Sequence, residues 1–238
     1  MNGNSIPAIS VAGESITGLV RSKNEDSFCL CAEKNSANIL AVVADGVGGH
    51  AHGDIASYLC CRSLLEQWRS NGYGNCKAGK SFAGKFRDCI KKANDIICFH
   101  NYKARNWPGM CTTLVAAVIT PEQLFVFNVG DSPFMLQRNG VLHQITENHN
   151  WGDSQTIISR AVGVKKNIEI DTHLLPRCRE DRYLLCSDGL SGYVSEDKIG
   201  ELFWKAHSPR AAVDSLLKAA LLAGGADNVT VIAAFEEE

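Results

Sequence analysis

Ile39-Leu-Ala-Val-Val-Ala-Asp45-Gly46 is an apolar run that ends on a carboxylate, which predicts a buried central strand with an acid at its mouth. Asp188 likewise follows an apolar run, and Asp227 precedes one. Acids gathered at the ends of buried strands repel one another, and a bound cation relieves that repulsion. The pattern therefore predicts a metal site made of carboxylates.

The composition is typical of one soluble globular domain. The chain has 238 residues, of which 45% are hydrophobic and 21% are charged, and its formal net charge is -2. That balance offers no basic surface for nucleic acid or for an anionic membrane. No apolar stretch approaches the ~20 residues that span a bilayer, and residues 1–10 lack the pattern of a secretory signal. We expect a single domain over residues 1–238, monomeric and cytoplasmic.

Ten cysteines could indicate disulfides or a zinc site, but their spacing argues against both. Cys29 and Cys31 alternate on a strand-like run, Cys60 and Cys61 are adjacent, and the chain contains no Cys-x-x-Cys pair. A chain of this length needs no disulfide staples. We expect reduced thiols that are mostly buried as small hydrophobic groups.

Hydrophobic periodicity and turn residues divide the chain into two blocks of strands and two pairs of helices. Strands are expected over residues 8–12, 15–20, 27–32, 39–44, 112–120, 123–129, 134–137, 141–145, 168–174, 181–186 and 228–235. Helices are expected over residues 53–70, 78–100, 195–206 and 209–223. A turn is expected at Gly13-Glu14, between the first two strands. This order predicts two packed sheets with helices outside them.

Carboxylate and carbonyl oxygens are hard ligands, which suit Mg2+, Mn2+ or Ca2+ better than zinc. Three or more acids from separate segments commonly hold two ions ~3.5–4 Å apart, and such a pair lowers the pKa of a shared water that attacks phosphorus in line. In this interpretation Asp45 bridges the ions, and Gly46 offers its carbonyl because the missing side chain lets an ion approach. The planar guanidinium of Arg21 suits bidentate binding of a phosphate.

No single motif decides this interpretation. An Asp-Gly pair is usually a turn, and Asn24-Glu-Asp26 alone would be an ordinary exposed polar stretch. The run Gly46-Val-Gly48-Gly49-His50 lacks the spacing of a nucleotide-binding loop, and no Lys-Ser or Lys-Thr follows it. The argument depends on the order of the motifs, in which each acid lies beside a strand.

In that order, the motifs resemble the metal-dependent protein phosphatases of the protein phosphatase 2C type, most of all the small bacterial members. The matching stretches extend from Gly18 to Ile232, and they are Arg21, Asn24 to Ser27, Val43 to His50, Gly53, Ala56-Ser57, Thr112-Thr113, Val129 to Ser132, Thr146, His149, Ser159 to Gly163, Leu184 to Leu190 and Ala226 to Ile232. The resemblance implies an α+β fold, a four-layer αββα sandwich of two packed, mainly antiparallel sheets flanked by helical pairs. It also implies hydrolysis of phosphoserine and phosphothreonine by direct attack of a metal-bridging water, without a covalent intermediate.

Carried over residue by residue, the resemblance implies a site for two ions, Mn2+ or Mg2+, between the sheets. Asp45 would bridge both ions, and the carbonyl of Gly46 would bind one of them. Asp188 and Asp227 would complete the other. Arg21 would hold the phosphate, so the expected catalytic residues are Arg21, Asp45 and Asp188.

Further acids would act around the two ions. Glu25 and Asp26 would orient metal-bound waters in the outer shell, and Asp131 would match the acid that contributes to a third metal in bacterial relatives. Two departures weaken the expectation of that third ion. Pro133 replaces an arginine after Gly-Asp-Ser, and Gly192 stands where the animal enzymes carry another acid.

Other departures concern the proton donor and the rim of the cleft. Val47 stands where the animal enzymes carry a histidine, as in bacterial relatives with an apolar residue there, and Cys111 replaces a glycine. No residue stands out as the general acid. His50 is near in sequence, but a role in packing the glycine-rich turn is the stronger expectation for it.

The largest departure lies between His149 and Arg160. Typical bacterial members carry a flap of several helical turns there, whereas this chain offers only residues 150–159. We therefore expect a shortened flap at about 147–160, an open metal cleft and weak sequence selectivity on short phosphopeptides. Trp151 is expected either at the rim of the cleft or in the core.

The leading interpretation is a cytoplasmic phosphatase of phosphorylated proteins, which are the products of a serine/threonine kinase. A non-catalytic relative that keeps the sandwich as a binding module is one alternative, but it would leave buried acids unpaired. A hydrolase of small phosphoesters is another, because the same pair of ions would serve it. Neither nucleic acid nor a membrane is expected as a partner.

Overall fold

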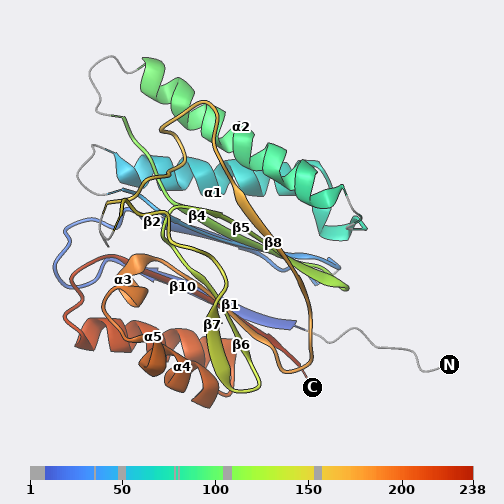
Figure 1. Ribbon diagram of the computed structural model, residues 1–238, viewed down its shortest axis with the longest axis vertical. Coiled ribbons are helices and arrows are strands. Elements are labelled where there is room, and N and C mark those ends of the chain that lie inside the picture. Colours follow the sequence, from blue (N-terminus) through green and yellow to red (C-terminus); the bar gives the residue numbers. More distant parts are fainter. Residues whose placement is uncertain are drawn as a thin grey trace.

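The computed structural model describes residues 9–34, 36–47, 52–77, 79, 81–103, 109–152 and 157–237. Two five-stranded sheets pack face to face, and a pair of helices covers the outer face of each (Figure 1). The two pairs are α1 (Gly53–Ser70) with α2 (Phe82–Lys103), and α4 (Glu196–Lys205) with α5 (Pro209–Leu222). The fold is therefore the expected four-layer αββα sandwich.

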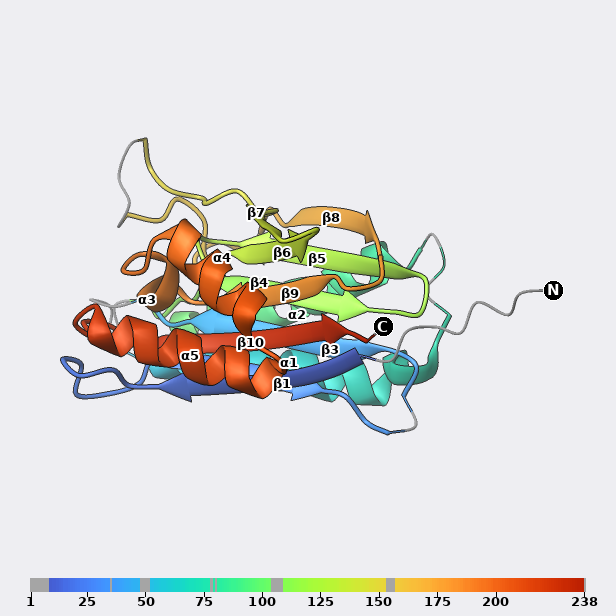
Figure 2. The same ribbon diagram turned by 90° about the horizontal axis from the view of Figure 1, so that it is seen from below.

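All strand pairings among the described residues are antiparallel. The sheet beside α4 and α5 has the order β1 (Ile9–Ile16), β10 (Val229–Glu236), β9 (Arg182–Cys186), β6 (Phe134–Arg138) and β7 (Val141–Gln144). The sheet beside α1 and α2 has the order β2 (Asp26–Cys31), β3 (Ile39–Asp45), β4 (Leu114–Ile119), β5 (Gln123–Val129) and β8 (Asp171–Pro176). The edge strands β7 and β8 lie on the same side of the sandwich (Figure 2). Because β1 pairs with β10, the first and last described strands stabilise each other.

Strand β3 is buried on both of its faces. Val43 lies in the apolar cluster between the two sheets, whereas Val42 and Ala44 pack in the cluster that includes Leu64 of α1. A strand covered on both faces needs apolar residues at every position, which explains why its sequence is a continuous apolar run. The strand therefore holds its terminal acid, Asp45, on a rigid support.

Serine residues begin the last two helices. The Oγ of Ser195 accepts the backbone N–H of Lys198 at 3.4 Å. The Oγ of Ser208 accepts the N–H of Ala211 at 3.2 Å. These bonds satisfy amide groups that have no partner inside the helix, and so define where each helix starts.

The structure corrects the expected start of the chain. Gly13-Glu14 is not a turn but lies inside β1, where Gly13 pairs with Ile232. A Cβ atom at position 13 would lie 3.1 Å from side-chain atoms of both Ile232 and Phe28. The glycine therefore permits close packing between strands, and residues 17–20, expected as a strand, form a loop.

Other helices and strands begin or end at residues different from those expected. Helix α2 starts at Phe82 and ends at Lys103, rather than spanning residues 78–100, and β8 spans Asp171–Pro176 rather than residues 168–174. Two short helices, η1 (Tyr73–Asn75) and α3 (Asp188–Ser191), were not expected. Short apolar runs carry little information about their ends, which neighbouring elements decide.

The cysteines match their expectation. All ten lack a disulfide partner, and seven of them are buried. Among the described residues, no helix combines the length and the apolar character that crossing a membrane requires.

Candidate metal and phosphate site

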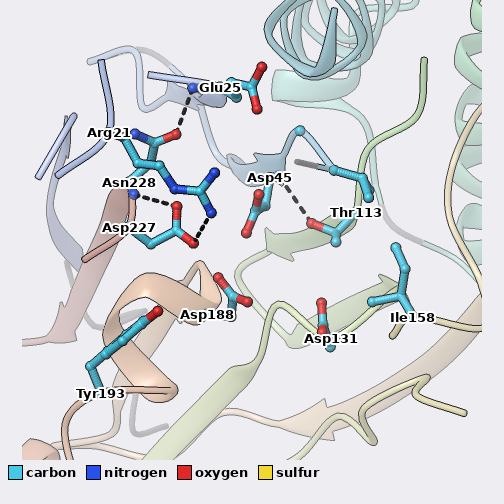
Figure 3. A pocket seen from close by; sticks show the side chains of 12 residues that line it. Arg21, Glu25, Asp45, Thr113, Asp131, Ile158, Asp188, Tyr193, Asp227 and Asn228 are labelled. Carbon is cyan, nitrogen blue, oxygen red and sulfur yellow. Dashed lines mark hydrogen bonds and ion pairs between the residues drawn. The ribbon is translucent and has the colours of Figure 1, made fainter. Parts of the chain in front are cut away.

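A cavity of about 280 Å³ lies at the end of the sandwich where β3 and β9 end and β10 begins. Five acids line it: Glu25, Asp45, Asp131, Asp188 and Asp227. Figure 3 shows the carboxylates of Asp45, Asp131 and Asp188 pointing into the same space from three separate strand ends. The fold thus gathers acids that are far apart in the sequence.

Seven of the eight predicted site residues line this cavity, namely Arg21, Glu25, Asp45, Gly46, Asp131, Asp188 and Asp227. Asp26 is the exception, because its side chain is buried beside Asp45 on the neighbouring strand. Its Oδ2 accepts hydrogen bonds from Ser187 Oγ at 2.7 Å and from Thr230 Oγ1 at 2.6 Å. Asp26 therefore joins β2 to the two acid-bearing segments of the other sheet.

Asp45 is held by the segment that precedes β4. Its backbone N–H donates to Thr113 Oγ1 at 3.0 Å, and its carbonyl accepts both the N–H of Thr113 and the hydroxyl of Thr112, each at 2.8 Å. Thr113 Oγ1 also bonds to Ser132 Oγ at 2.7 Å, next to Asp131. The two threonines thus orient the Asp45 backbone and connect it to the Asp131 turn.

Packing gives a further reason for the glycine at position 46. A Cβ atom at this position would collide with the carbonyl oxygen of Gly53 and would lie 2.6 Å from that of Glu25. The first turn of α1 and the loop before β2 therefore press against position 46, and its N–H donates to Glu25 O at 3.1 Å. The glycine brings these three backbone segments together at the cavity.

Asp188 begins the short helix α3 directly after β9. The next residue, Gly189, packs against the backbone of Asn228, and a Cβ atom there would collide with the Asn228 carbonyl oxygen. The backbone N–H of Ser187 donates to Thr230 O at 3.1 Å. The close contact brings Asp188 and Asp227 to the same wall of the cavity.

Asn228 anchors the loop that carries Arg21 and Glu25. Its Oδ1 accepts the N–H of Glu25 at 2.8 Å, and its Nδ2 donates to the carbonyl oxygens of Thr17 and Lys23, both at 2.9 Å. The sequence interpretation assigned this residue no role, although it lies within a quoted motif. A buried amide with three backbone partners is recognisable only from the folded chain.

Burial and mutual repulsion raise the pKa values of four acids at the site. Burial, with smaller contributions from Asp26 and Asp188, raises the pKa of Asp45 well above its ordinary value. Burial also raises the pKa of Asp26 and of Asp131, each to about 6, and raises the pKa of Asp188. The cluster therefore disfavours its own negative charge, and a bound cation would reverse that balance.

The donor set fits a hard divalent cation. Carboxylate and carbonyl oxygens dominate it, and no cysteine or histidine is among the described residues that line the cavity. Within the described ranges, no three Asp, Glu, His or Cys side chains stand close enough, as placed, to ligate one ion together. Mg2+ commonly binds one or two carboxylates and completes its shell with water and substrate phosphate. Because no three of these side chains meet at one point, the acids suit ions that are bound partly through bridging water molecules.

Comparison with known proteins decides the family. The model of the family described as Protein phosphatase 2C matches residues 20–222. The chain belongs to the protein phosphatase 2C family. The serine/threonine phosphatase stp of Listeria monocytogenes is 32% identical over 232 residues, which cover 90% of this chain and 91% of that protein.

Solved structures of this phosphatase family superpose on nearly the whole chain. The catalytic domain of the serine/threonine protein phosphatase PstP, in complex with two manganese ions, is 32% identical, with a TM-score of 0.84 over 97% of this chain and 99% of that one. The phosphatase Stp1 from Staphylococcus aureus is 26% identical, with a TM-score of 0.89 over 100% of both chains.

Residues 147–160 were expected to form a shortened flap. Their described parts, residues 147–152 and 157–160, pair with each other in a narrow antiparallel arrangement. Asn150 bridges Ile158, and the N–H of Trp151 donates to Ile157 O at 2.8 Å. Ile158 lines the cavity, whereas Trp151 is 65% exposed, so of the two alternatives for this residue the one in the core is wrong. Gly48, Gly49 and His50 lie outside the described residues.

The base of the hairpin is fastened to the Asp131 turn. His149 Nδ1 accepts the N–H of Gly130 at 3.0 Å, and its Nε2 lies 2.9 Å from Asp171 Oδ2. Because Nδ1 is an acceptor here, Nε2 carries the proton and donates to Asp171. Arg160 donates to the other oxygen of Asp171 at 3.0 Å. This chain of contacts holds Gly130 and Asp131 in place.

Proposed function

We propose that this member of the protein phosphatase 2C family is a metal-dependent phosphatase that hydrolyses phosphoserine and phosphothreonine residues of proteins. The single observation that carries the proposal is the convergence of five carboxylates and the Arg21 guanidinium on one cavity. Similarity to proteins named serine/threonine phosphatases supports the same activity.

We assign the metal ligands as Asp45, Gly46, Asp188 and Asp227, and the cofactor as two Mn2+ or Mg2+ ions. The two manganese ions bound to the PstP catalytic domain support this cofactor. When bound, such ions polarise a phosphoryl group and lower the pKa of water.

The protein's own residues bind and orient the substrate around that centre. Arg21 presents a planar guanidinium at the cavity wall, where it can donate two hydrogen bonds to the oxygens of a phosphate. Glu25 and Asp26 act from the outer shell, Glu25 at the wall and Asp26 through its hydrogen bonds to neighbouring segments. Asp131 is the candidate for a third ion, but Gly192 supplies no second carboxylate.

We further propose that the substrates are products of a serine/threonine kinase and that the protein is a cytoplasmic monomer. Ten free cysteines support a reducing compartment. The pairing of Asn150 with Ile158 at the expected flap supports a cleft that is open to peptides, because the described residues of this segment form no helical turn over the cavity.

Hydrolysis of a phosphothreonine peptide after chelation, and again after Mn2+ or Mg2+ is added back, tests the proposal. Activity that returns only with metal supports the phosphatase. A protein that binds the peptide but never cleaves it would be a binding module. Faster turnover of a small phosphoester than of any phosphopeptide would instead indicate a hydrolase of small molecules.

A further inference from the structure

Arg21 and Asp227 form an ion pair across the wall of the cavity. Arg21 Nη2 lies 2.8 Å from Asp227 Oδ2, and the other oxygen, Oδ1, accepts the N–H of Asn228 at 2.8 Å. Figure 3 shows the guanidinium beside this carboxylate. Both oxygens of the proposed metal ligand Asp227 thus already have a hydrogen-bond donor.

The ion pair is exposed enough to open. The Arg21 side chain is 44% exposed and the Asp227 side chain 23%, so water can replace either partner. The backbone, in contrast, is fixed, because Leu19 N–H donates to Gly225 O at 2.7 Å and Asn228 holds the carbonyls on either side of Arg21. The Arg21 side chain can therefore change its partner while its backbone stays in place.

A divalent cation and a guanidinium compete for one carboxylate. Each is attracted to the negative charge, and the two positive groups repel each other at short range. The same guanidinium binds substrate phosphate best when its planar fork is not engaged elsewhere. Asp227 is therefore the carboxylate for which the metal and the proposed phosphate-binding arginine compete.

We propose that Arg21 competes with the divalent cation for Asp227, so that binding of the metal releases the guanidinium to the substrate phosphate. The inference rests on the proposed function and adds an order to it, with the metal binding first and the phosphate second. By linkage the effect is reciprocal. The ion pair between Arg21 and Asp227 weakens metal binding, and bound metal weakens the ion pair by the same factor.

Calorimetric titration of Mn2+ into chelator-treated protein tests the competition without measuring catalysis. Arg21→Met and Lys23→Met each remove one positive charge from the same loop, but Lys23 pairs with Asp54, at 2.7 Å, and does not line the cavity. We expect Arg21→Met to tighten the Asp227-dependent binding step by about fivefold, and Lys23→Met to change it by less than about twofold. In an Asp227→Asn background, where only the direct repulsion between Arg21 and the ion remains, Arg21→Met should change Mn2+ binding by less than about twofold.

The possible failures are distinguishable. A wild-type protein that binds no Mn2+ would refute the proposed metal site and this inference together. If Mn2+ binds, but Arg21→Met leaves its dissociation constant unchanged, weakens binding, or behaves like Lys23→Met, only the competition is refuted. The release step has its own readout by NMR, because Mg2+ should speed solvent exchange of the Arg21 side-chain protons, identified by their loss in Arg21→Met. Unchanged exchange at saturating Mg2+ would overturn the release.

Discussion

Asn228 holds Glu25 in place, since its side-chain oxygen accepts the Glu25 backbone N–H at 2.8 Å across 203 positions of sequence. The same amide donates to Thr17 O and Lys23 O, so one side chain closes the loop that presents Arg21. Asn228 is 5% exposed, and little water can replace these bonds. The position of Arg21, the proposed phosphate ligand, therefore depends on a residue at the other end of the chain.

Asn228→Ala is expected to raise KM for a phosphopeptide and to lower the free energy of unfolding by roughly 1–3 kcal/mol, because buried backbone groups lose their partners. Steady-state kinetics and urea denaturation measure the two effects. Asn38→Ala is the matched control, because Asn38 is also buried and donates to two carbonyls, Tyr73 O and Cys76 O. It should lose stability with KM unchanged, and an equal KM effect in both variants would contradict the anchoring role.

Asp45→Ala and Asp188→Ala should each reduce Mn2+-dependent hydrolysis of an aryl phosphate to background. Their carboxylates meet in one cavity, and burial raises the pKa of both. Without metal, either variant should be as stable as the wild type or more so, because removing one acid relieves repulsion among the others. Turnover close to that of the wild type would refute the assignment of these ligands.

Gly46→Ala should destabilise the protein and impair activity, because its new methyl group would collide with backbone atoms of Gly53 and Glu25. A loss of roughly 1–3 kcal/mol is expected for such overpacking, measured by thermal or urea unfolding. Gly84→Ala, within α2, is the control, because a Cβ atom there meets nothing within 4 Å. That variant should gain about 0.5–1 kcal/mol, since alanine favours a helix more than glycine does.

Stability in the presence of a chelator should fall as pH rises. Burial raises the pKa of Asp26 and Asp131 from 3.8 to about 6, so between these values the folded state binds more protons than the unfolded state. The stabilisation that these two protonated carboxyl groups provide is complete below pH 3.8 and is lost as the pH rises through about 6. We expect a decrease of roughly 3 kcal/mol for each of the two groups, or about 6 kcal/mol in total across this window, by urea denaturation.

Two comparisons isolate those carboxyl groups from the rest of the protein. Replacing both Asp26 and Asp131 with asparagine should make the decrease smaller, with Asp45 and Asp188 supplying the remainder, and saturating Mn2+ should offset it in the wild type by binding the folded state. If the wild type lost no more stability between pH 4 and 6 under chelation than the double variant does, Asp26 and Asp131 would not be protonated in the folded protein.

An open cleft should discriminate poorly among phosphopeptides. Ile158 is the residue that the 147–160 segment contributes to the described cavity wall, so few contacts are available to select flanking residues. Across a panel of phosphothreonine peptides with varied neighbours, kcat/KM should differ by less than about a hundredfold. Larger differences, reproduced in longer protein substrates, would mean that another surface recognises the sequence.

Much of the fold was predictable because local patterns determine it. The ranges expected for α1 and β5 agree with the structure, since helical spacing and bounded apolar runs specify them. Gly13 misled the prediction because a glycine in a strand and a glycine in a turn look alike until the neighbouring strand is known. Helix α3 is a single turn, too short to show a period.

The sequence by itself determined which chemical groups are present and that acids end or precede buried strands, since burial requires apolar runs and the family motifs retain their order. Only the tertiary structure decided how those groups meet. The pairing of Arg21 with Asp227, the anchoring of Glu25 by Asn228 and the burial of Asp26 behind the cavity join residues some 160 to 206 positions apart. Such contacts depend on the path of the chain through two sheets, and no local pattern encodes that path.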